Sequence, residues 1–510
     1  MNKKLQTINC LLPESRFNKV KHEGIGWASS NIALCKYWGK RDLSLNLPNN
    51  SSLSVSLGNK GTLTKIRSND RGVDAYKVNG SLIDESSDFA RRLREFLDLF
   101  RNVGSGFELE TENNLPTAAG FASSASGFAA LVKGLNDLYD WDLKSSELSI
   151  LARLGSGSAC RSIEAGFVKW DRGVSADGLD SYGQPLAASW PNLRVGLLIL
   201  STEIKKTSSR EAMFRTVHTS PNYGDWLIQA EKDLIKLLEA IASRDLERLG
   251  EISECNSNLM HQVMVDAVPP IIYTSQETKA ASETIKRLRA QGTLVFYTQD
   301  AGENLVLLFE VKDELAIIAA FPSLEIVAPF TDSSANQLIL VDKDDNQVGT
   351  EAKMTAHLRG LTHRAFSVVV LRKTAGQLEI LLQQRSASKY HTPNLWSNAC
   401  CGHPRPQEGI VAAGEQRLFE ELGIRLSLVK KGVFHYRSGF GSGSLLIEDE
   451  VDHVLVGFSE AEQIPYNITE VQACEWLGIS ELKRRVNNFP EQYTPWFLIL
   501  LEKFNYFQGY

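Results

Sequence analysis

The stretch NLPTAAGFASSASG, Asn114–Gly127, joins a turn rich in Gly, Ala and Ser to an Ala-rich helical pattern that continues to Tyr139. Small residues let a backbone approach a ligand closely, hydroxyl groups can bond to that ligand, and free N–H groups at a helix start favour phosphate oxygens. The stretch therefore predicts a loop that holds the phosphates of a nucleotide. Its shape alone also fits a Ser-capped helix that does nothing except pack.

The segments around this loop predict an α+β chain with more than one domain, because 510 residues exceed the usual size of a single core. The first 24 residues are polar and are expected to be irregular. After them the patterns predict a strand-like region to about 80, helices at 88–101, 225–263 and 274–291, and strands near 293–298 and 304–311. Turn-forming residues at 329–334 mark a domain border.

The remaining third of the chain alternates strands with one helix. The patterns predict strands at 337–341, 366–372, 378–383 and 451–458 and a helix at about 408–422. We therefore expect an N-terminal extension over residues 1–24, a first domain over 25–333 and a second over 334–510.

Composition limits the partners of the chain. Lys and Arg total 55 against 61 Asp and Glu, a net charge of −6, so no general basic field attracts nucleic acid or an anionic membrane. The seven cysteines are scattered without a disulfide pattern, and no signal-like or membrane-spanning stretch is present, so we expect a cytoplasmic protein with small-molecule substrates. The sequence leaves open whether the chain forms a homodimer.

Five ordered segments of the first domain carry a family resemblance. They are Asn31–Asp42 followed by Leu45–Ser54, the Asn114–Gly127 stretch, Gly155–Ser162, Ser208–Met213 and Thr298–Asn304. Together they closely resemble mevalonate diphosphate decarboxylases of the GHMP kinase superfamily, over about residues 25–330. The resemblance implies that ATP, with Mg²⁺, phosphorylates a tertiary hydroxyl, after which phosphate and CO₂ leave.

The resemblance also implies roles for individual residues. Asp300 would face the substrate hydroxyl as base or acceptor, and Arg161 would clamp the substrate carboxylate with its two-pronged guanidinium. Further substrate contacts would be Lys36, Tyr37, Lys40, Ser158 and Ser209, and ATP-phosphate contacts would be Gly120, Ser123, Ser124 and Ser126. By residue type alone, an Asp before Ala-Gly also fits a turn and Arg161 a surface ion pair. A monophosphate substrate stays open.

A second motif lies in the last third of the chain. Gly402, Glu408 and Gln416–Ile424 fit a Nudix box, except that Gln-Arg stands where Arg-Glu belongs. A Nudix hydrolase needs that missing Glu in the carboxylate cluster that holds metals on a diphosphate. We therefore expect the fold without hydrolysis by the usual route.

Around the same helix the sequence supplies five candidate metal ligands, namely His357, His363, His403, Glu448 and Glu450. In an extended strand Glu448 and Glu450 project from one face, and Cys401 and His403 share a face by the same rule. Three imidazoles with two carboxylates suit Mn²⁺, Zn²⁺ or Fe²⁺ better than Ca²⁺. Any one of these histidines alone is more often a packed or surface residue.

This constellation resembles type I isopentenyl diphosphate isomerase, from about 337 to 500. The resemblance implies an acid and a base at Cys401 and Glu450, a transition metal, Mn²⁺ or Zn²⁺, on the five ligands, and Mg²⁺ on Glu421. Trp396 and Trp496 would face the carbocation-like intermediate. Tyr436, Lys353, Arg385, Lys389 and Arg417 would contact the substrate, the last four through its diphosphate.

Together the resemblances imply a GHMP-kinase-like, two-lobed α+β domain followed by a Nudix-like α/β/α sandwich. The product of the first reaction is the substrate of the second, so we interpret the chain as a bifunctional isoprenoid enzyme. Alternatives are a monophosphate decarboxylase fused to the isomerase, a regulatory or dimerisation role for one half, and a kinase joined to a Nudix hydrolase.

Overall fold

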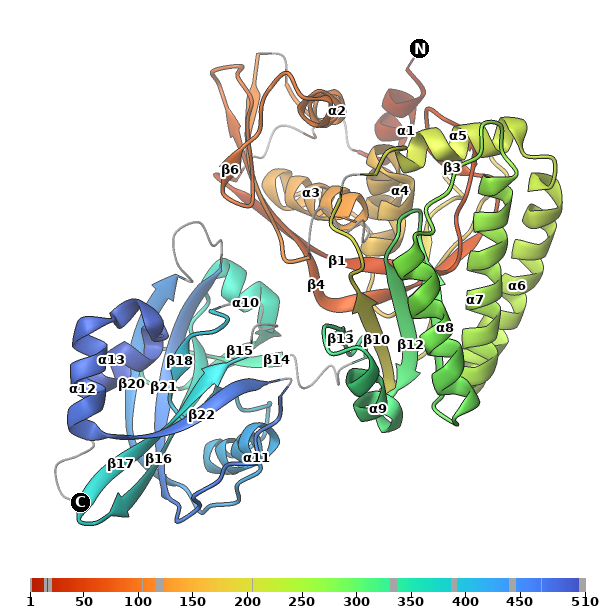
Figure 1. Ribbon diagram of the computed structural model, residues 1–510. Coiled ribbons are helices and arrows are strands. Elements are labelled where there is room, and N and C mark those ends of the chain that lie inside the picture. Colours follow the sequence, from red (N-terminus) through yellow and green to blue (C-terminus); the bar gives the residue numbers. More distant parts are fainter. Residues whose placement is uncertain are drawn as a thin grey trace. The chain divides into compact units, whose positions relative to one another are not determined.

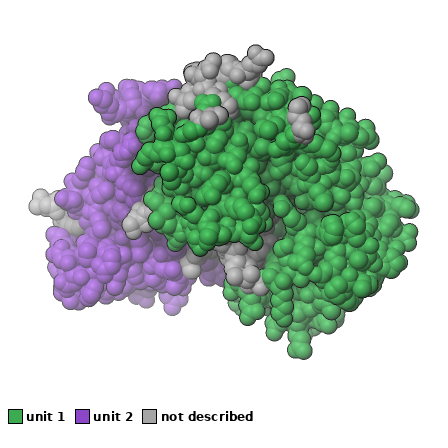
Figure 2. Space-filling model, turned by 90° about the horizontal axis from the view of Figure 1, so that it is seen from above, with its two compact units in different colours: residues 1–331 green, residues 332–510 purple. Residues whose placement is uncertain are grey.

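The computed structural model describes residues 2–12, 16, 21–102, 104–115, 123–203, 205–330, 337–386, 392–439, 446–468 and 470–503, with Ser123 described in its backbone only. The chain divides into two compact units, residues 1–331 and 332–510 (Figure 2). Among the described residues, no helix combines the length and apolar character that a membrane crossing requires.

Unit 1 contains two sheets that form its two lobes (Figure 1). The larger sheet has the order β6-β5-β7-β4-β8-β9, with β1 paired to β4, and a short β2–β3 pair lies beside it. The strands of the larger sheet are β1 (Gly24–Cys35), β4 (Ser52–Asn69), β5 (Ala75–Val78), β6 (Ser81–Leu82), β7 (Gly106–Asn113), β8 (Phe167–Trp170) and β9 (Gly183–Pro185). The separate pair consists of β2 (Lys40–Asp42) and β3 (Leu47–Pro48). The smaller sheet, in the order β11-β12-β10-β13, contains β10 (Leu193–Leu198), β11 (Val295–Gln299), β12 (Leu305–Glu310) and β13 (Glu325–Val327).

Helices cover both sheets of unit 1. The larger sheet is accompanied by α1 (Lys3–Leu11), α2 (Asp88–Leu97), α3 (Ser123–Tyr139), α4 (Ser145–Gly155) and the 3₁₀ helix η2 (Gly157–Ser162). The smaller sheet is accompanied by α5 (Ser209–Thr219), α6 (Tyr223–Ser243), α7 (Leu246–Val265), α8 (Gln276–Ala290), η3 (Val311–Asp313) and α9 (Glu314–Ala320). Helices α7 and α8 both pack against β11.

Glycine sets the distance between β1 and α3. A Cβ atom added to Gly26 would lie 2.0 Å from the carbonyl oxygen of Ala130, and one added to Gly24 would lie 2.1 Å from that of Gly134. Only residues without a Cβ allow the strand and helix to approach this closely. The approach matters for function, because β1 ends at Cys35, directly before Lys36, and α3 begins at Ser123.

Two expectations from sequence are wrong at the level of single elements. Residues 3–11 form a helix, not an irregular segment, because Asn2 caps its first turn and Ile8 is fully buried in the core of unit 1. The predicted helix at 225–263 is two helices, α6 and α7, because Arg244 adopts a left-handed conformation with φ of 53°.

Unit 2 is one sheet between two layers of helices. Strands β15-β14-β16-β17-β18 follow one another, while β19 and β21 pair with β16, β20 with β21, and β22 with β17. They are β14 (Gln337–Val341), β15 (Gln347–Ala352), β16 (His363–Thr374), β17 (Gln377–Arg385), β18 (Trp396–Ser397), β19 (Cys400–Gly402), β20 (Val429–Gly439), β21 (Ile447–Phe458) and β22 (Val471–Gly478). The helical segments are α10 (Lys353–Arg359), α11 (Ile410–Leu422), α12 (Ile479–Asn488), η5 (Pro490–Gln492) and α13 (Pro495–Lys503).

Figure 1 shows α12 and α13 on one face of this sheet and α11 on the other. Each face has its own apolar core. One core joins Val369 and Val454 to Phe497, and the other joins Val368 and Leu455 to Leu418. Neighbouring strand residues therefore point to opposite cores, as the two-residue period of a strand requires. The observed layers agree with the α/β/α sandwich expected from sequence.

Candidate functional sites

Unit 1 contains a cavity of about 630 Å³, and the described residues of its wall include seven basic but only two acidic side chains. The basic residues are Lys4, Lys36, Lys40, Arg92, Arg161, Lys205 and Arg210, and the acidic ones are Glu95 and Asp300. In a chain of net charge −6, this is a local concentration of positive charge. A low-dielectric cavity with such a wall is suited to a polyanion.

An ion pair between Lys36 and Asp300 lies at this cavity. The Lys36 Nζ is 2.6 Å from Asp300 Oδ1; the lysine side chain is 2% exposed and the aspartate 33% exposed. Asn256 Oδ1 accepts a hydrogen bond from the Lys36 backbone N–H at 2.8 Å, and Asn50 donates to the Lys36 carbonyl at 2.8 Å. The end of β1 therefore holds the ammonium firmly beneath the carboxylate.

The charges around Asp300 keep it ionised. Its partial burial acts to raise its pKa, but Lys36, Lys205 and Arg161 outweigh that effect and lower the pKa below the ordinary value. Burial lowers the pKa of Lys36, with Asp300 opposing the shift. A carboxylate at the cavity can accept a hydrogen bond from a substrate hydroxyl.

Arg161 sits on η2 and is held by two polar neighbours from unit 1. Its Nη1 donates to Ser52 Oγ at 2.6 Å, and its Nε donates to Asn31 Oδ1 at 3.3 Å. Its guanidinium carbon also lies 5.7 Å from the centre of the Trp170 ring. These contacts orient a buried cation without neutralising it, because no carboxylate among the described residues pairs with it.

Most other residues predicted for this site also line the cavity. Lys40 lies on β2 and donates to Asn46 Oδ1 at 2.7 Å, and burial together with Arg210 and Lys4 lowers its pKa to about 8. Tyr37, Ser158, Ser209 and Ser124 are part of the cavity wall.

Ser126 is located differently from the prediction. It is fully buried, and its hydroxyl lies 3.0 Å from Ser30 Oγ and 2.7 Å from Thr62 Oγ1. It lies on the side of α3 that packs against β1 and β4, so its hydroxyl faces the strands. Gly120 and the Ser123 side chain lie outside the described residues.

Sequence reasoning missed four basic cavity residues, namely Lys4, Arg92, Lys205 and Arg210. Arg210 lies within the matched segment Ser208–Met213, and Lys205 lies just before it. Their positive charge at that segment is the only sequence signal for these two residues. Lys4 carried no signal, because the segment before residue 25 was expected to be irregular.

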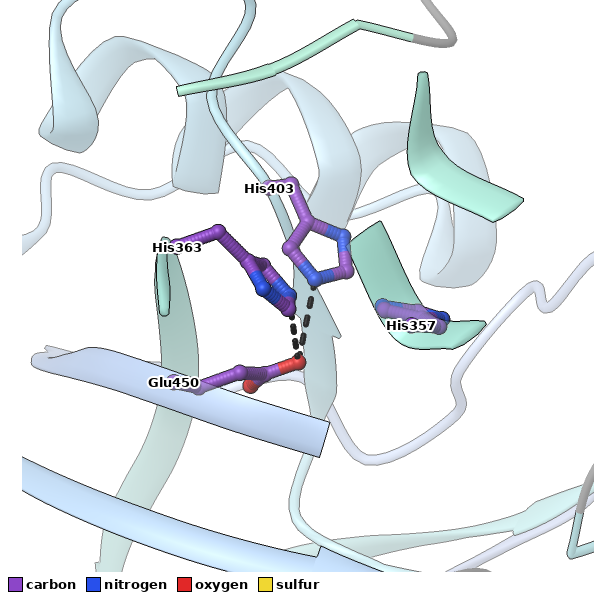
Figure 3. A group of neighbouring side chains, drawn as sticks. All are labelled: His357, His363, His403 and Glu450. Atoms are coloured by element: carbon purple, nitrogen blue, oxygen red, sulfur yellow. Dashed lines mark hydrogen bonds and ion pairs between the residues drawn. The ribbon is translucent and has the colours of Figure 1, made fainter. Parts of the chain in front are cut away.

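Unit 2 brings four predicted metal ligands together (Figure 3). One ligand atom from each of His357, His363, His403 and Glu450 lies within 4.8 Å of all the others. Glu450 Oε1 is 3.1 Å from His403 Nε2 and 3.4 Å from His363 Nε2. Two donors about 2.1 Å from one ion lie about 3.0–3.4 Å apart at octahedral or tetrahedral angles, so these spacings fit a metal.

Sheet register explains this convergence. Parallel pairing places His363 of β16 opposite Glu450 of β21, while α10 supplies His357 and the chain after β19 supplies His403. His363 Nδ1 lies 2.7 Å from the Leu361 carbonyl, which selects the tautomer with a lone pair on Nε2. This is the arrangement that a metal-binding histidine requires.

Glu448, the fifth predicted ligand, does not belong to this group. It shares one face of β21 with Glu450, as predicted, and the Tyr436 hydroxyl lies 2.9 Å from Glu448 Oε2 and 2.8 Å from Glu450 Oε2. Burial and the charge of Glu450 raise the pKa of Glu448.

Cys401 lies on the same sheet, on the other side of β16 from β21. Its Sγ is 3.2 Å from Asn398 Oδ1 and 3.5 Å from Ser367 Oγ, and Ser367 donates to Asp452 Oδ2 at 2.7 Å. Burial raises the pKa of the thiol to about 12. Among the described residues no hydrogen bond joins Cys401 to Glu450; the polar chain from the thiol leads to Asp452.

The predicted Mg²⁺ and diphosphate residues have mixed environments. Glu421 is buried, pairs with Arg417 and accepts a hydrogen bond from Gln383 at 2.9 Å, and Arg417 also lies 2.7 Å from Glu470. Arg385 lies 5.2 Å from the Trp496 ring, whose Nε1 donates to Ser397. Lys353 begins α10 and Trp396 forms β18. Lys389 lies outside the described residues.

Three family models match the chain. A "Diphosphomevalonate decarboxylase-like N-terminal domain" matches residues 28–183, a "Mevalonate 5-diphosphate decarboxylase C-terminal domain" matches 195–373, and a NUDIX domain matches 361–497. The second match ends inside unit 2 and overlaps the third.

Named relatives agree with the first two models. The chain is 36% identical over 349 residues to a diphosphomevalonate decarboxylase of Gibberella zeae, covering 63% of this chain and 90% of the relative. It is 38% identical over 312 residues to that of Debaryomyces hansenii, covering 57% and 80%.

Solved structures agree as well. The mevalonate diphosphate decarboxylase of Staphylococcus aureus matches with a TM-score of 0.57 at 36% identity, covering 60% of this chain and 95% of that one. A second, matching at TM-score 0.57 and 38% identity over 60% and 97% of the chains, is described as a complex with MVAPP, AMPPCP and magnesium. The chain therefore belongs to the diphosphomevalonate decarboxylase family and carries a NUDIX domain after its decarboxylase-like region.

Proposed function

We propose that the chain catalyses two consecutive reactions. Unit 1 would decarboxylate mevalonate 5-diphosphate with ATP to give isopentenyl diphosphate, and unit 2 would isomerise that product to dimethylallyl diphosphate. The observation that carries the first assignment is the Lys36–Asp300 pair in a cavity with seven basic side chains. Family membership supports the same reaction.

In the first reaction, Asp300 accepts a hydrogen bond from the tertiary hydroxyl of the substrate and orients its oxygen toward ATP. The γ-phosphoryl group moves to that oxygen, ADP leaves, and the hydroxyl proton passes to Asp300. The bond between the substrate carboxylate and its neighbouring carbon then breaks, its electron pair forms the carbon–carbon double bond, and phosphate and CO₂ leave. Lys36 and Arg161 stabilise the negative charges that these steps move.

The charge of the cavity favours a diphosphate over a monophosphate substrate. ATP and a diphosphate together bring more negative charge than ATP and a monophosphate, and seven basic side chains are available to balance it. The second candidate function is that of a monophosphate decarboxylase. With that substrate, several basic side chains of the cavity would have no phosphate charge to balance them.

In unit 2, His357, His363, His403 and Glu450 would hold a transition metal, Mn²⁺ or Zn²⁺, with Glu448 nearby. When bound, the metal supplies positive charge that lowers the proton affinity of its carboxylate ligand. Cys401 and Glu450 lie on strands at opposite sides of β16. One of these residues would deliver a proton to one carbon atom of the substrate, and the other residue would remove a proton from a second carbon atom. The double bond moves and no atoms are lost.

The Nudix helix gives an argument against hydrolysis. Gln416 stands where the Nudix box has Arg, Arg417 stands where it has the catalytic Glu, and Arg417 pairs with Glu421 of the same box. A cation in the carboxylate cluster disfavours metal binding there. This supports a role other than hydrolysis for unit 2.

One experiment tests both assignments. The purified chain is given ATP with either mevalonate monophosphate or mevalonate diphosphate, CO₂ release is measured, and the five-carbon product is identified by NMR. We expect CO₂ only with the diphosphate, and a mixture of isopentenyl and dimethylallyl diphosphates. Release of phosphate from nucleoside diphosphates without either mevalonate compound would instead support the kinase and hydrolase alternative.

A further inference from the structure

The helix α1 is a docked part of unit 1. Ile8 is fully buried and Leu12 is 4% exposed, and both belong to the same apolar cluster as Leu47 and Leu151. The helix packs on α4 (Figure 1). Lys3 Nζ lies 2.5 Å from Asp42 Oδ2. The position of α1 is therefore set by packing.

This docking places Lys4 in the cavity wall. Lys4 lies four residues before Ile8, so both side chains project from one face of the helix. Lys4 is partly buried and lines the cavity, while Lys3, its neighbour, does not. The helix thus carries one lysine to the cavity and one to the outer surface.

Lys4 joins Lys40 and Arg210 in a group of like charges. All three line the cavity, and among the described residues none of them forms an ion pair with a carboxylate. Lys40 donates to the Asn46 amide, which leaves its charge in place. Three neighbouring cations repel one another, and at Lys4 the charge of Glu95 in the same wall offsets this repulsion less than Arg210 adds to it, so an anion bound between the three cations lowers the free energy of the arrangement.

The match to the decarboxylase-like N-terminal model begins at residue 28, so α1 lies before the region that defines this family model. We propose that α1 adds Lys4 to the phosphate-binding part of the decarboxylase cavity, where it contacts the diphosphate group of the acceptor substrate, and not ATP. The inference rests on the proposed function of unit 1. It makes Lys4 a specificity-determining residue supplied by a segment outside the matched family region.

The test compares three single variants of the full chain. Lys4→Gln removes the proposed contact, Lys4→Arg retains its charge, and Lys3→Gln removes an equal charge from the same helix outside the cavity. We expect Lys4→Gln to raise KM for mevalonate diphosphate about tenfold, the usual order for one charge-assisted hydrogen bond, with kcat and KM for ATP within about twofold. Lys4→Arg and Lys3→Gln should stay within about twofold of the wild type.

Equal KM values in Lys4→Gln and Lys3→Gln would overturn the proposal, as would a rise confined to KM for ATP. A second measurement does not depend on turnover. Inorganic pyrophosphate should slow amide hydrogen exchange in α1 of the wild type and of Lys3→Gln, but not of Lys4→Gln. If the wild type releases no CO₂ from mevalonate diphosphate, the proposed function fails, and the exchange measurement still decides whether Lys4 binds a diphosphate.

Discussion

The two candidate sites handle charge in opposite ways. The cavity of unit 1 distributes seven basic side chains over about 630 Å³, on segments from α1 to α5. The cluster of unit 2 gathers four ligand atoms within 4.8 Å, on strands and a helix that one sheet register aligns. The attraction between a cation and a polyanion falls slowly with distance, whereas a metal–ligand distance can deviate by only about 0.2 Å from its ideal value.

This difference predicts how each site responds to substitution. Loss of one distributed cation should weaken binding by a modest factor, because the others remain. Loss of one metal ligand, or of a group that touches the reacting atoms, should be far more damaging. For the two catalytic variants, Asp300→Asn and Cys401→Ala, the activity of the other unit of the same chain is an internal control.

The largest effect is expected for Asp300→Asn. This variant keeps the shape of the side chain but leaves the substrate hydroxyl without a carboxylate acceptor, so kcat for CO₂ release should fall about 10⁴-fold. Isomerase activity should be unchanged. Glu303→Gln, a neighbouring acid without a place in the cavity wall, is the matched control. Full decarboxylation by Asp300→Asn would remove Asp300 from the mechanism.

The second effect is expected in the isomerase. Cys401→Ala removes the proposed proton-transfer group and should reduce isomerisation about 10³-fold, while ATP-dependent CO₂ release continues. Cys400→Ala is the control, because Cys400 is fully buried in the apolar core beside α11. Product ratios measured by NMR distinguish the two variants. Equal losses in both would indicate a packing effect at β19.

The third effect concerns the metal itself. His403→Gln removes one of four converging ligands, so the affinity of unit 2 for Mn²⁺ or Zn²⁺ should fall at least about 100-fold. His435→Gln is the control, since His435 is half exposed, pairs with Asp449 and lies outside the cluster. Metal content after dialysis against a chelator series measures the change. Retention of metal by His403→Gln would place the ion elsewhere.

The smallest effect is a pH dependence of the distributed site. The pKa of Lys40 is lowered to about 8, so the ammonium is charged below that pH and becomes neutral above it. KM for mevalonate diphosphate should therefore rise several-fold between about pH 8 and 9. The phosphates of bound substrate favour the charged form of Lys40, so they make this rise smaller. Lys40→Arg should remove the rise, since Arg stays charged. An unchanged profile in Lys40→Arg would assign the titration to another group.

Sequence motifs determined much of this account. The Asn31–Asp42 and Thr298–Asn304 segments predict Lys36 and Asp300 as site residues, and the sequence alone predicts the histidines and Glu450 as metal ligands. Residue types at short spacings carry this information, because a mechanism needs particular functional groups and a strand fixes which neighbours share a face. The α+β class and the layers of unit 2 followed from hydrophobic periodicity and family resemblance.

The tertiary structure alone decided which of these residues meet. That Ser126 packs against Ser30 and Thr62, that Glu448 stays outside the ligand group, and that Cys401 connects to Asp452 depend on strand register between distant segments. Lys4 is the clearest case, because a lysine in a short polar segment has no recognisable pattern until the burial of Ile8 orients its helix. Local sequence does not determine which way these side chains point, because several directions are allowed locally. Packing between segments that are distant in the sequence selects one of them.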